Sequence, residues 1–236
     1  MAERADEGIV LRSWPNGEGH AIVSVFSAHH GRVQGLVKGG DKKKALLQPG
    51  NLVTFVHRRR LDSQLGTLSP DLEKDICGLV FYSPARLHML RYVGELLYYA
   101  LPEEQPYPRF FDTLRRFVTE LNGAKTWQRL AFLELDLLGA LGFGLALTPE
   151  EAVTDAHGSP LYYVSPKTGR AVSREMGMPY HDKMLLLPKL FGGVEGGFLD
   201  VFKLTGHFLR VALAERDLPS RKTLLELGTK SDFTDA

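Results

Sequence analysis

The sequence predicts an α+β fold in which a small all-β domain precedes an α-helical domain, and three observations lead to this prediction. From residue 8 to 72 the apolar residues come in short, β-branched-rich runs separated by turn formers. From 83 to 142, and again from 199 to 216, their spacing becomes that of amphipathic helices. Between these helical parts, residues 148 to 188 lack either period and are rich in turn formers.

The first 72 residues contain five candidate strands. Turns are expected at PNGEG (15–19) and HHG (29–31). Five short strands without an intervening helical pattern favour a small barrel, and the five-stranded barrel that commonly binds nucleic acid is the OB-fold. A glycine within a strand, such as Gly35, suits the bends of a small barrel. The predicted strands are GIVLRSW, AIVSVFSA, RVQGLVKG, NLVTFVHR and LGTLSPDL.

The helical part begins where the apolar period changes. Ser83 and Pro84 are a suitable N-cap and first helical residue, and a second helix is expected to follow Pro106-Tyr107-Pro108. Gly123 and Gly142 stand where the second and third helices should end. Consecutive amphipathic helices predict a helical bundle. The expected helices begin near 84, 108 and 126, span 199–216, and follow Pro219–Ser220.

Composition limits the class of protein. The chain has 236 residues, of which 44% are hydrophobic and 24% charged, values that are ordinary for a globular protein. A single cysteine excludes an intramolecular disulfide and a thiolate cluster around zinc. The first residues do not resemble a signal peptide, and no apolar run reaches about 18 residues. We therefore expect a soluble, cytoplasmic protein.

Positive charge gathers in one part of a nearly neutral chain. Between residues 32 and 60, eight basic side chains stand against one acidic side chain, Asp41. We predict that they converge into one track for a nucleic-acid backbone, giving affinity without reading sequence. Aromatic residues of the same strands, Trp14, Phe26 and Phe55, could stack on bases, although core packing is the more frequent role. The alternative is a solvated surface whose charges prevent edge pairing. The predicted DNA-binding residues are Arg32, Lys38, Lys42, Lys43, Lys44, Arg58, Arg59 and Arg60.

Other motifs do not indicate catalysis. Neither G-x-x-x-x-G-K-[ST] nor a strand-linked G-x-G-x-x-G is present, and G-x-S-x-G and H-E-x-x-H are missing. The histidines near the turns lack acidic or thiol neighbours at ligand spacing, so no metal site is expected. Cys77 is expected to be a small buried residue. The paired acids at 103–104 and 150–151 lie at helix entrances, where the helix dipole favours them. We expect neither enzymatic activity nor a cofactor.

Three runs of the sequence together resemble the RecO family of bacterial recombinational repair proteins. They are VFSAHHGRVQGLVKGGDKKKALLQPGNLV, ELDLLGALGFG and VSPKTGRAVS. The resemblance implies an OB-fold domain (1–78), a helical domain in two parts (79–147 and 191–236) and a zinc-ribbon-like insert (148–190). It also implies a protein that binds single- and double-stranded DNA and anneals complementary strands. The implied partners are RecR and the C-terminal tail of single-stranded DNA-binding protein, and the implied result is loading of RecA.

The insert departs from the family pattern. Many relatives hold it with two C-x-x-C pairs, whose matching positions here are Ala152 with Asp155 and Ala171 with Arg174. We expect no metal in it. One hypothesis is that an ion pair between Asp155 and Arg174 replaces the metal, and another is packing around the LYYV run at 161–164.

The resemblance places a partner surface on the helical domain, and the last helices carry further basic side chains. The tail pocket would lie on the third helix, with Arg129, Phe132 and Leu133 as its candidates. Additional DNA contacts could come from Lys203, Arg210, Arg216, Arg221 and Lys222. Two rival functions stay open, namely an adaptor whose barrel binds an acidic protein and an RNA-binding barrel protein.

Overall fold

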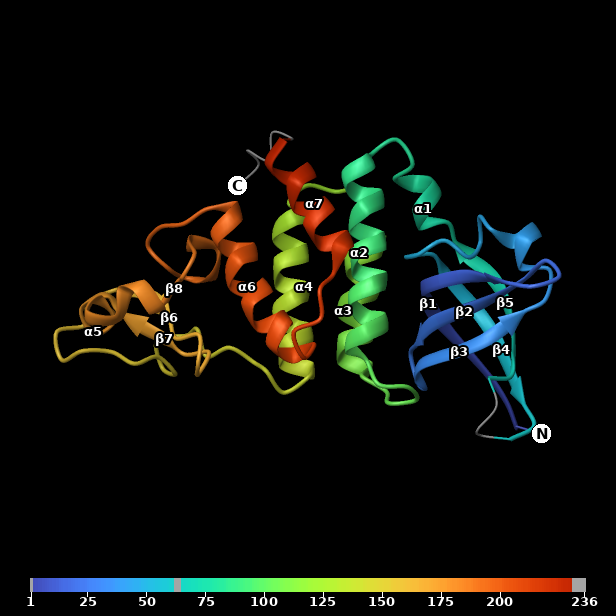
Figure 1. The fold of residues 1–236 in the computed structure, drawn as a ribbon, viewed down its shortest axis with the longest axis horizontal. Coiled ribbons are helices and arrows are strands. Elements are labelled where there is room, and N and C mark those ends of the chain that lie inside the picture. Colours follow the sequence, from blue (N-terminus) through green and yellow to red (C-terminus); the bar gives the residue numbers. More distant parts are fainter. Residues whose placement is uncertain (1, 62–64, 231–236) are drawn as a thin grey trace. The chain divides into compact units, whose positions relative to one another are not determined.

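The computed structural model of the chain describes residues 2–61 and 65–230, and these form two compact units (Figure 1). The first unit contains the chain up to Thr126 together with the segment from Leu218 onward. The second contains Trp127–Asp217. The α+β class is confirmed, because the N-terminal part is one five-stranded sheet and the part that follows is mainly helical.

The five N-terminal strands make a sheet that closes on itself in the order β1-β2-β3-β5-β4. Neighbouring strands are antiparallel except β3 and β5, which are parallel and meet at Leu36 and Thr67. Alternate side chains point inward and form a core dominated by valine. The strands are β1 (Ala2–Asn16), β2 (His20–Ser27), β3 (Gly31–Val37), β4 (Leu52–Arg59) and β5 (Thr67–Lys74).

The first strand is longer than its apolar residues predict. It begins at Ala2 and not at Gly8, because Ala2–Glu7 pair with residues 54–59 of β4. This extension carries three acidic side chains that bond within the first unit: Glu3 to Arg58, Asp6 to Ser27 and His29, and Glu7 to Arg115.

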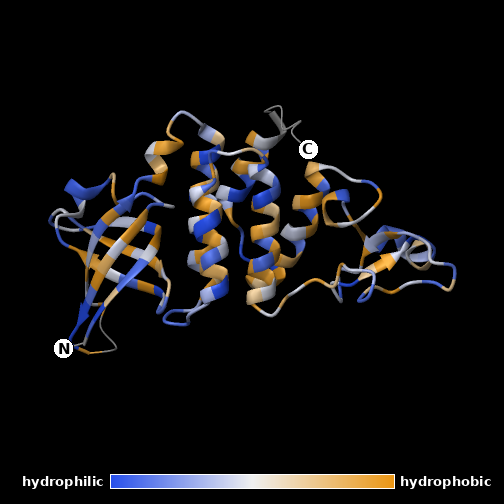
Figure 2. Cartoon of the chain, turned by 180° about the vertical axis from the view of Figure 1, so that it is seen from behind, coloured by the Kyte–Doolittle hydropathy of each residue, from blue (hydrophilic) through white to orange (hydrophobic). Residues whose placement is uncertain are grey.

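Two helices of the first unit, α2 and α3, pack on the closed sheet. Prolines occupy the first turn of α2 and α3, where a missing N–H costs no hydrogen bond. Phe26 of β2 meets the rings of Phe110 and Phe111 on α3. Figure 2 shows that apolar residues recur along both the strands and these helices. The helices are α1 (Ile76–Leu79), α2 (Pro84–Ala100), α3 (Pro108–Thr119) and α7 (Pro219–Lys230), which packs beside α2.

The second unit combines two longer helices with a small sheet. Trp127 of α4 packs against the rings of Phe198 and Phe202 on α6, and the hydroxyl of Thr205 donates to the buried carboxylate of Glu134. The elements are α4 (Thr126–Ala140), β6 (Leu161–Val164), β7 (Ala171–Ser173), α5 (Arg174–Gly177), η2 (Met178–Lys183), β8 (Leu185–Leu186), η3 (Lys189–Phe191) and α6 (Phe198–Ala212); the sheet order is β7-β6-β8.

Backbone pairing brings the segment around Ala152 and Asp155 beside the segment around Ala171 and Arg174. The N–H of Val153 donates to the carbonyl of Ala171, and that of Ser173 to the carbonyl of Val153, at 2.8 and 2.9 Å. The hypothesis of an Asp155–Arg174 ion pair is wrong. Arg174 lies over the ring of Tyr162, and Asp155 accepts from backbone N–H groups of its own loop.

Asp155 also lies beside the buried hydroxyl of Ser173. The two groups lack the geometry of a full hydrogen bond, but the hydroxyl, together with the loop N–H groups, holds the pKa of the carboxyl well below its ordinary value against the opposing effect of burial. Within the described ranges no group of three or more His, Cys, Asp or Glu side chains is placed to hold a metal ion.

Candidate nucleic-acid interface

The first basic triplet lies on an exposed 3₁₀ turn at one end of the closed sheet. This turn, η1 (Gly40–Lys43), follows β3, with Gly39 in the left-handed conformation (φ 64°). The N–H of Asp41 donates to the carbonyl of Gly19, and the N–H of Gly39 to Nδ1 of His20, so the turn is held against the β1–β2 connection. The side chains of Lys38 and Lys42–Lys44 are exposed, and no salt bridge to them occurs in the described part of the chain.

The segment behind the lysines is anchored by a buried asparagine. The side-chain amide of Asn51 donates to the carbonyls of Ala45 and Leu46 at 2.9 and 3.2 Å, and its carbonyl oxygen accepts from the N–H of Cys77. Leu47 fills the end of the core between the strands. The L-Q-P-G-N run therefore holds the lysine-bearing turn in a fixed place.

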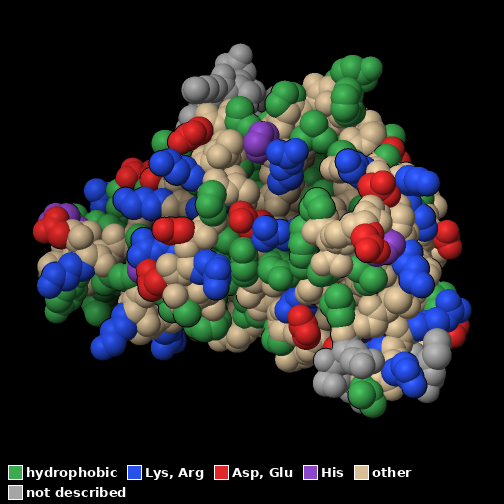
Figure 3. Space-filling view, turned by 45° about the vertical axis from the view of Figure 1, so that its right-hand side comes forward, with side chains coloured by type: hydrophobic (Ala, Val, Ile, Leu, Met, Phe, Trp, Pro, Cys, Tyr) green, Lys and Arg blue, Asp and Glu red, His purple; other side chains and the backbone are tan. Residues whose placement is uncertain are grey.

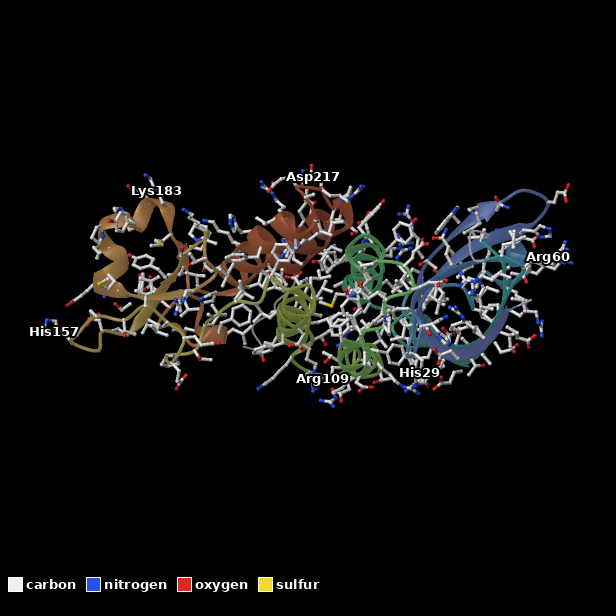
Figure 4. All side chains as sticks on the ribbon, turned by 90° about the horizontal axis from the view of Figure 1, so that it is seen from below. His29, Arg60, Arg109, His157, Lys183 and Asp217 are labelled. Carbon is white, nitrogen blue, oxygen red and sulfur yellow. The ribbon has the colours of Figure 1, made fainter. Side chains whose placement is uncertain are left out.

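Two of the three arginines in the second basic triplet form ion pairs within the first unit. Arg58 forms a two-pronged pair with Glu3, with N–O distances of 2.8 and 3.1 Å. This contact lowers the pKa of Glu3 and raises that of Arg58. Arg59, whose side chain is only 7% exposed, forms a similar pair with Glu104. Arg60 is exposed and points away from the barrel (Figure 4).

Arg32 also stabilises the packing of the first unit. Its Nε donates to the carbonyl of Leu101 at 2.9 Å, Nη1 lies 3.2 Å from the carboxylate of Glu103, and the guanidinium stands over the ring of Tyr98. These contacts fix the end of α2 against β3. A side chain used in this way is not free to hold a phosphate.

The two triplets do not converge. Lys42–Lys44 precede the start of β4, whereas Arg58 and Arg59 lie at its other end, and the eight residues of β4 extend over about 23 Å. Glu3 and Glu104 lie beside the second triplet. Figure 3 likewise shows Lys and Arg side chains interspersed with Asp and Glu on the face that it presents. Five of the predicted side chains are exposed and form no salt bridge within the described residues. They are Lys38, Lys42, Lys43, Lys44 and Arg60.

A bulge in β1 directs two further side chains outward near the lysine end. The pairing with β2 shifts between Val10 and Arg12, which leaves Leu11 unpaired. Val10 points into the core, whereas Arg12 and Trp14, beyond the shift, point outward. Trp14 pairs with Ile22, and Ile22 with Leu36, so these three side chains form a row across β1, β2 and β3. All three are partly exposed.

Helix α2 adds two tyrosines to this surface. Gly94 allows the close approach, since a Cβ there would collide with the carbonyl of Leu11. One turn later the ring of Tyr98 meets that of Trp14 edge to face, with centroids 5.8 Å apart, and Tyr99 follows at 5.1 Å from Tyr98. The guanidinium of Arg12 lies within 6 Å of the rings of Trp14 and Tyr98 and donates to the hydroxyl of Tyr99. We name Arg12, Trp14, Tyr98 and Tyr99 the aromatic-arginine cluster.

Only one of the three aromatic residues predicted to stack is accessible. Phe26 is fully buried under α3, and Phe55 is 3% exposed in the barrel core. Trp14 is the accessible one. Sequence reasoning missed Arg12, Tyr98 and Tyr99, because neither the bulge nor the docking of α2 leaves a signal in the apolar pattern.

The additional basic candidates differ in their exposure and in their contacts. Arg210 pairs with Glu215 at 2.6 Å, which raises the pKa of Arg210, and Arg221 donates to the hydroxyl of Tyr92. Lys203, Arg216 and Lys222 are exposed. On α4, Leu133 is buried, while Phe132 is 46% exposed and its ring touches Phe191; Arg129 is partly exposed.

The single cysteine lies in surroundings that disfavour its thiolate. The pKa of Cys77 is raised by burial, which makes its thiol less reactive. Across residues 2–61 and 65–230, no helix has the length and apolar character needed to cross a membrane.

Comparison with known proteins covers most of the chain. A family model described as "Recombination protein O N terminal" matches residues 1–72, and one described as "Recombination protein O C terminal" matches residues 82–222. A DNA repair protein RecO of Paracoccus denitrificans is 41% identical over 90% of this chain and 88% of its own length. A DNA repair protein RecO of Rhodospirillum centenum is 38% identical over 94% of this chain and 92% of its own length.

Proposed function

The chain belongs to the recombination protein O family of DNA repair proteins, and from this premise we propose that it is a non-catalytic mediator that binds DNA through the lysine end of its barrel. The observation that carries the proposal is the group of four exposed lysines on a turn that is held in place and has no acidic partner among the described residues. Fixed cations without internal partners can bind phosphates and release the counterions of a nucleic acid.

The architecture supports the same proposal. A five-stranded closed sheet with the order β1-β2-β3-β5-β4 is compatible with an OB-fold, in which the face of strands 2 and 3 and the adjacent loops bind single strands. The β1–β2 connection and η1 lie side by side at the rim of that face. The boundaries 1–78, 79–147, 148–190 and 191–236 stay a prediction from the family resemblance, and they divide the chain differently from its two compact units.

The mechanism we propose needs no covalent step. Lysines that contact phosphates of two strands reduce the repulsion that slows pairing, so complementary strands anneal faster. A second surface on α4, with Arg129 and Phe132, would receive the acidic and aromatic tail of single-stranded DNA-binding protein. RecR would act with the resulting complex to load RecA in the cytoplasm. Arg60, Lys203, Arg216 and Lys222 are the remaining candidates for DNA contact.

A salt titration tests the DNA-binding role of the lysine end. The variant Lys42→Ala/Lys43→Ala/Lys44→Ala should bind single-stranded DNA more weakly, and the slope of log affinity against log salt should fall by about 2. The matched control, Lys167→Ala/Lys183→Ala/Lys189→Ala, removes three exposed lysines from the second unit and should leave the slope unchanged. Equal behaviour of the two variants would refute the assignment.

The rival functions are separated by the choice of ligand. An RNA-binding protein would prefer RNA to DNA of the same sequence. An adaptor for acidic proteins would show no measurable affinity for either at physiological salt.

A further inference from the structure

We propose that the aromatic-arginine cluster is a stacking platform for unpaired bases, with Trp14 as its accessible ring, and that it gives the barrel a preference for single-stranded over double-stranded DNA. This inference rests on the proposed DNA-binding function and deepens it. Lysines alone attract phosphates of either form of DNA, whereas an aromatic face can be used only by a base that is free of its partner strand.

The position of Trp14 supports this role. The bulge at Leu11 directs Trp14 out of the core, although an indole in that place could otherwise help to fill the barrel. Its row continues through Ile22 and Leu36, which gives a partly exposed apolar strip across three strands. Lys38 follows Leu36 by two residues, and Asn16 and His20 bring the β1–β2 turn to the same end of the sheet.

The two tyrosines hold the indole in a fixed orientation. Tyr98 is contacted by both Arg12 and Arg32, with guanidinium to ring distances of 5.4 and 5.0 Å, and these two contacts restrict the motion of its ring. It then supports Trp14 edge to face at 5.8 Å. A ring that is already oriented loses little conformational freedom when a base stacks on it.

The positive charge around the aromatic-arginine cluster favours a nucleic acid strand as its ligand. Arg12 is exposed and carries no salt bridge in the described part of the chain, and the nearby lysine turn adds further positive charge. An acidic peptide with an aromatic side chain would share part of this chemistry. A nucleic acid strand fits better, because it supplies a phosphate for each base along the whole strip.

The test compares a thymine oligonucleotide with one of equal length in which abasic spacers replace the bases. The wild-type chain should prefer the thymine strand. Replacing Trp14 with leucine should weaken thymine binding roughly tenfold or more and remove the preference, while binding of the abasic strand and of duplex DNA changes less than about twofold. The exposed Phe81, replaced by alanine, is the aromatic control and should change none of these affinities.

Fluorescence gives a second measurement that does not depend on the stability of the leucine variant. The chain has two tryptophans, and Trp127 is only 8% exposed in the second unit. Thymine strands should quench the wild type, and Trp14→Phe should abolish the quenching while retaining most of the affinity. Equal losses for thymine, abasic and duplex DNA, or unchanged affinities, would overturn the platform. If the wild type bound none of the three, the proposed DNA-binding function itself would fail.

Discussion

The guanidinium of Arg59 is paired with the carboxylate of Glu104, with Nη2 2.9 Å from Oε2, and this pair joins the end of β4 to the segment after α2. Arg59 is almost fully buried, whereas Glu104 is about one-third exposed. The pairing lowers the pKa of Glu104. A residue that the sequence places in a DNA-binding triplet thus contributes to the packing of the first unit.

Replacing Arg59 with methionine should destabilise the first unit by about 1–3 kcal/mol, because the partners of a buried charged group lose their hydrogen bonds. The melting temperature measures this effect. The adjacent Arg60→Met variant should melt like the wild type, since Arg60 is exposed. If Arg60→Met were the less stable of the two, the assignment of roles within the triplet would be wrong.

Gly94 and Gly139 should respond in opposite ways to alanine. At Gly94 the new Cβ would collide with the backbone of β1, so the variant should lose about 1–3 kcal/mol and α2 should separate from the bulge. At Gly139 of α4 the Cβ meets nothing within 4 Å, and the variant should gain up to about 1 kcal/mol from helix propensity. Urea unfolding of both variants measures the difference. Two stabilised variants would contradict the close approach of α2.

The pair of His29 and Asp6 should make the first unit most stable at a pH between the pKa of Asp6 and the pKa of His29. Their side chains are 2.7 Å apart, and Asp6 raises the pKa of His29. Burial alone would raise the pKa of Asp6, but hydrogen bonds from Ser27 and His29 lower it overall. The contribution of His29 is complete below its ordinary pKa and is lost as pH rises through the raised value. The contribution of Asp6 is complete above its ordinary pKa and is lost as pH falls through the lowered value.

Thermal melts from pH 2 to 9 measure this dependence. In His29→Gln the decline on the alkaline side should become smaller, and the decline on the acid side should begin at a higher pH, because Asp6 loses the hydrogen bond from the imidazole that helps to lower its pKa. Direct titration of the imidazole by NMR should show a pKa above 6.5. An imidazole that titrates below this value would exclude the pairing.

Alanine variants of Phe132 and Leu133 should differ in effect: the first should weaken peptide binding, and the second should lower the stability of the second unit. Leu133 is buried in the second unit, so its replacement by alanine should cost about 2–5 kcal/mol. Phe132 is 46% exposed, and its replacement by alanine should cost far less stability but should weaken binding of an acidic tail peptide with a terminal aromatic residue. Calorimetry with the peptide, beside thermal melts, tests both statements. Unchanged peptide affinity in Phe132→Ala would remove this helix face from the proposed receptor.

The sequence predicted those features that depend on local pattern. Runs of β-branched residues indicated the strands, and proline and glycine marked the helix ends, because both effects act over a few residues. It could not show that Arg59 would be paired, because Glu104 lies 45 positions away and meets it only after α2 has docked. For the same reason the outward turn of Trp14 was hidden, since it depends on a pairing shift between β1 and β2.

The first unit is interrupted in the sequence. Helix α7, which packs beside α2, is separated from the rest of that unit by about 90 residues that form the second unit. During synthesis the barrel, α2 and α3 therefore leave the ribosome well before the helix that completes their packing. Until α7 arrives, the side of α2 that it covers is open to chaperones and proteases, so a truncation that removes α7 should harm the region of the chain made first.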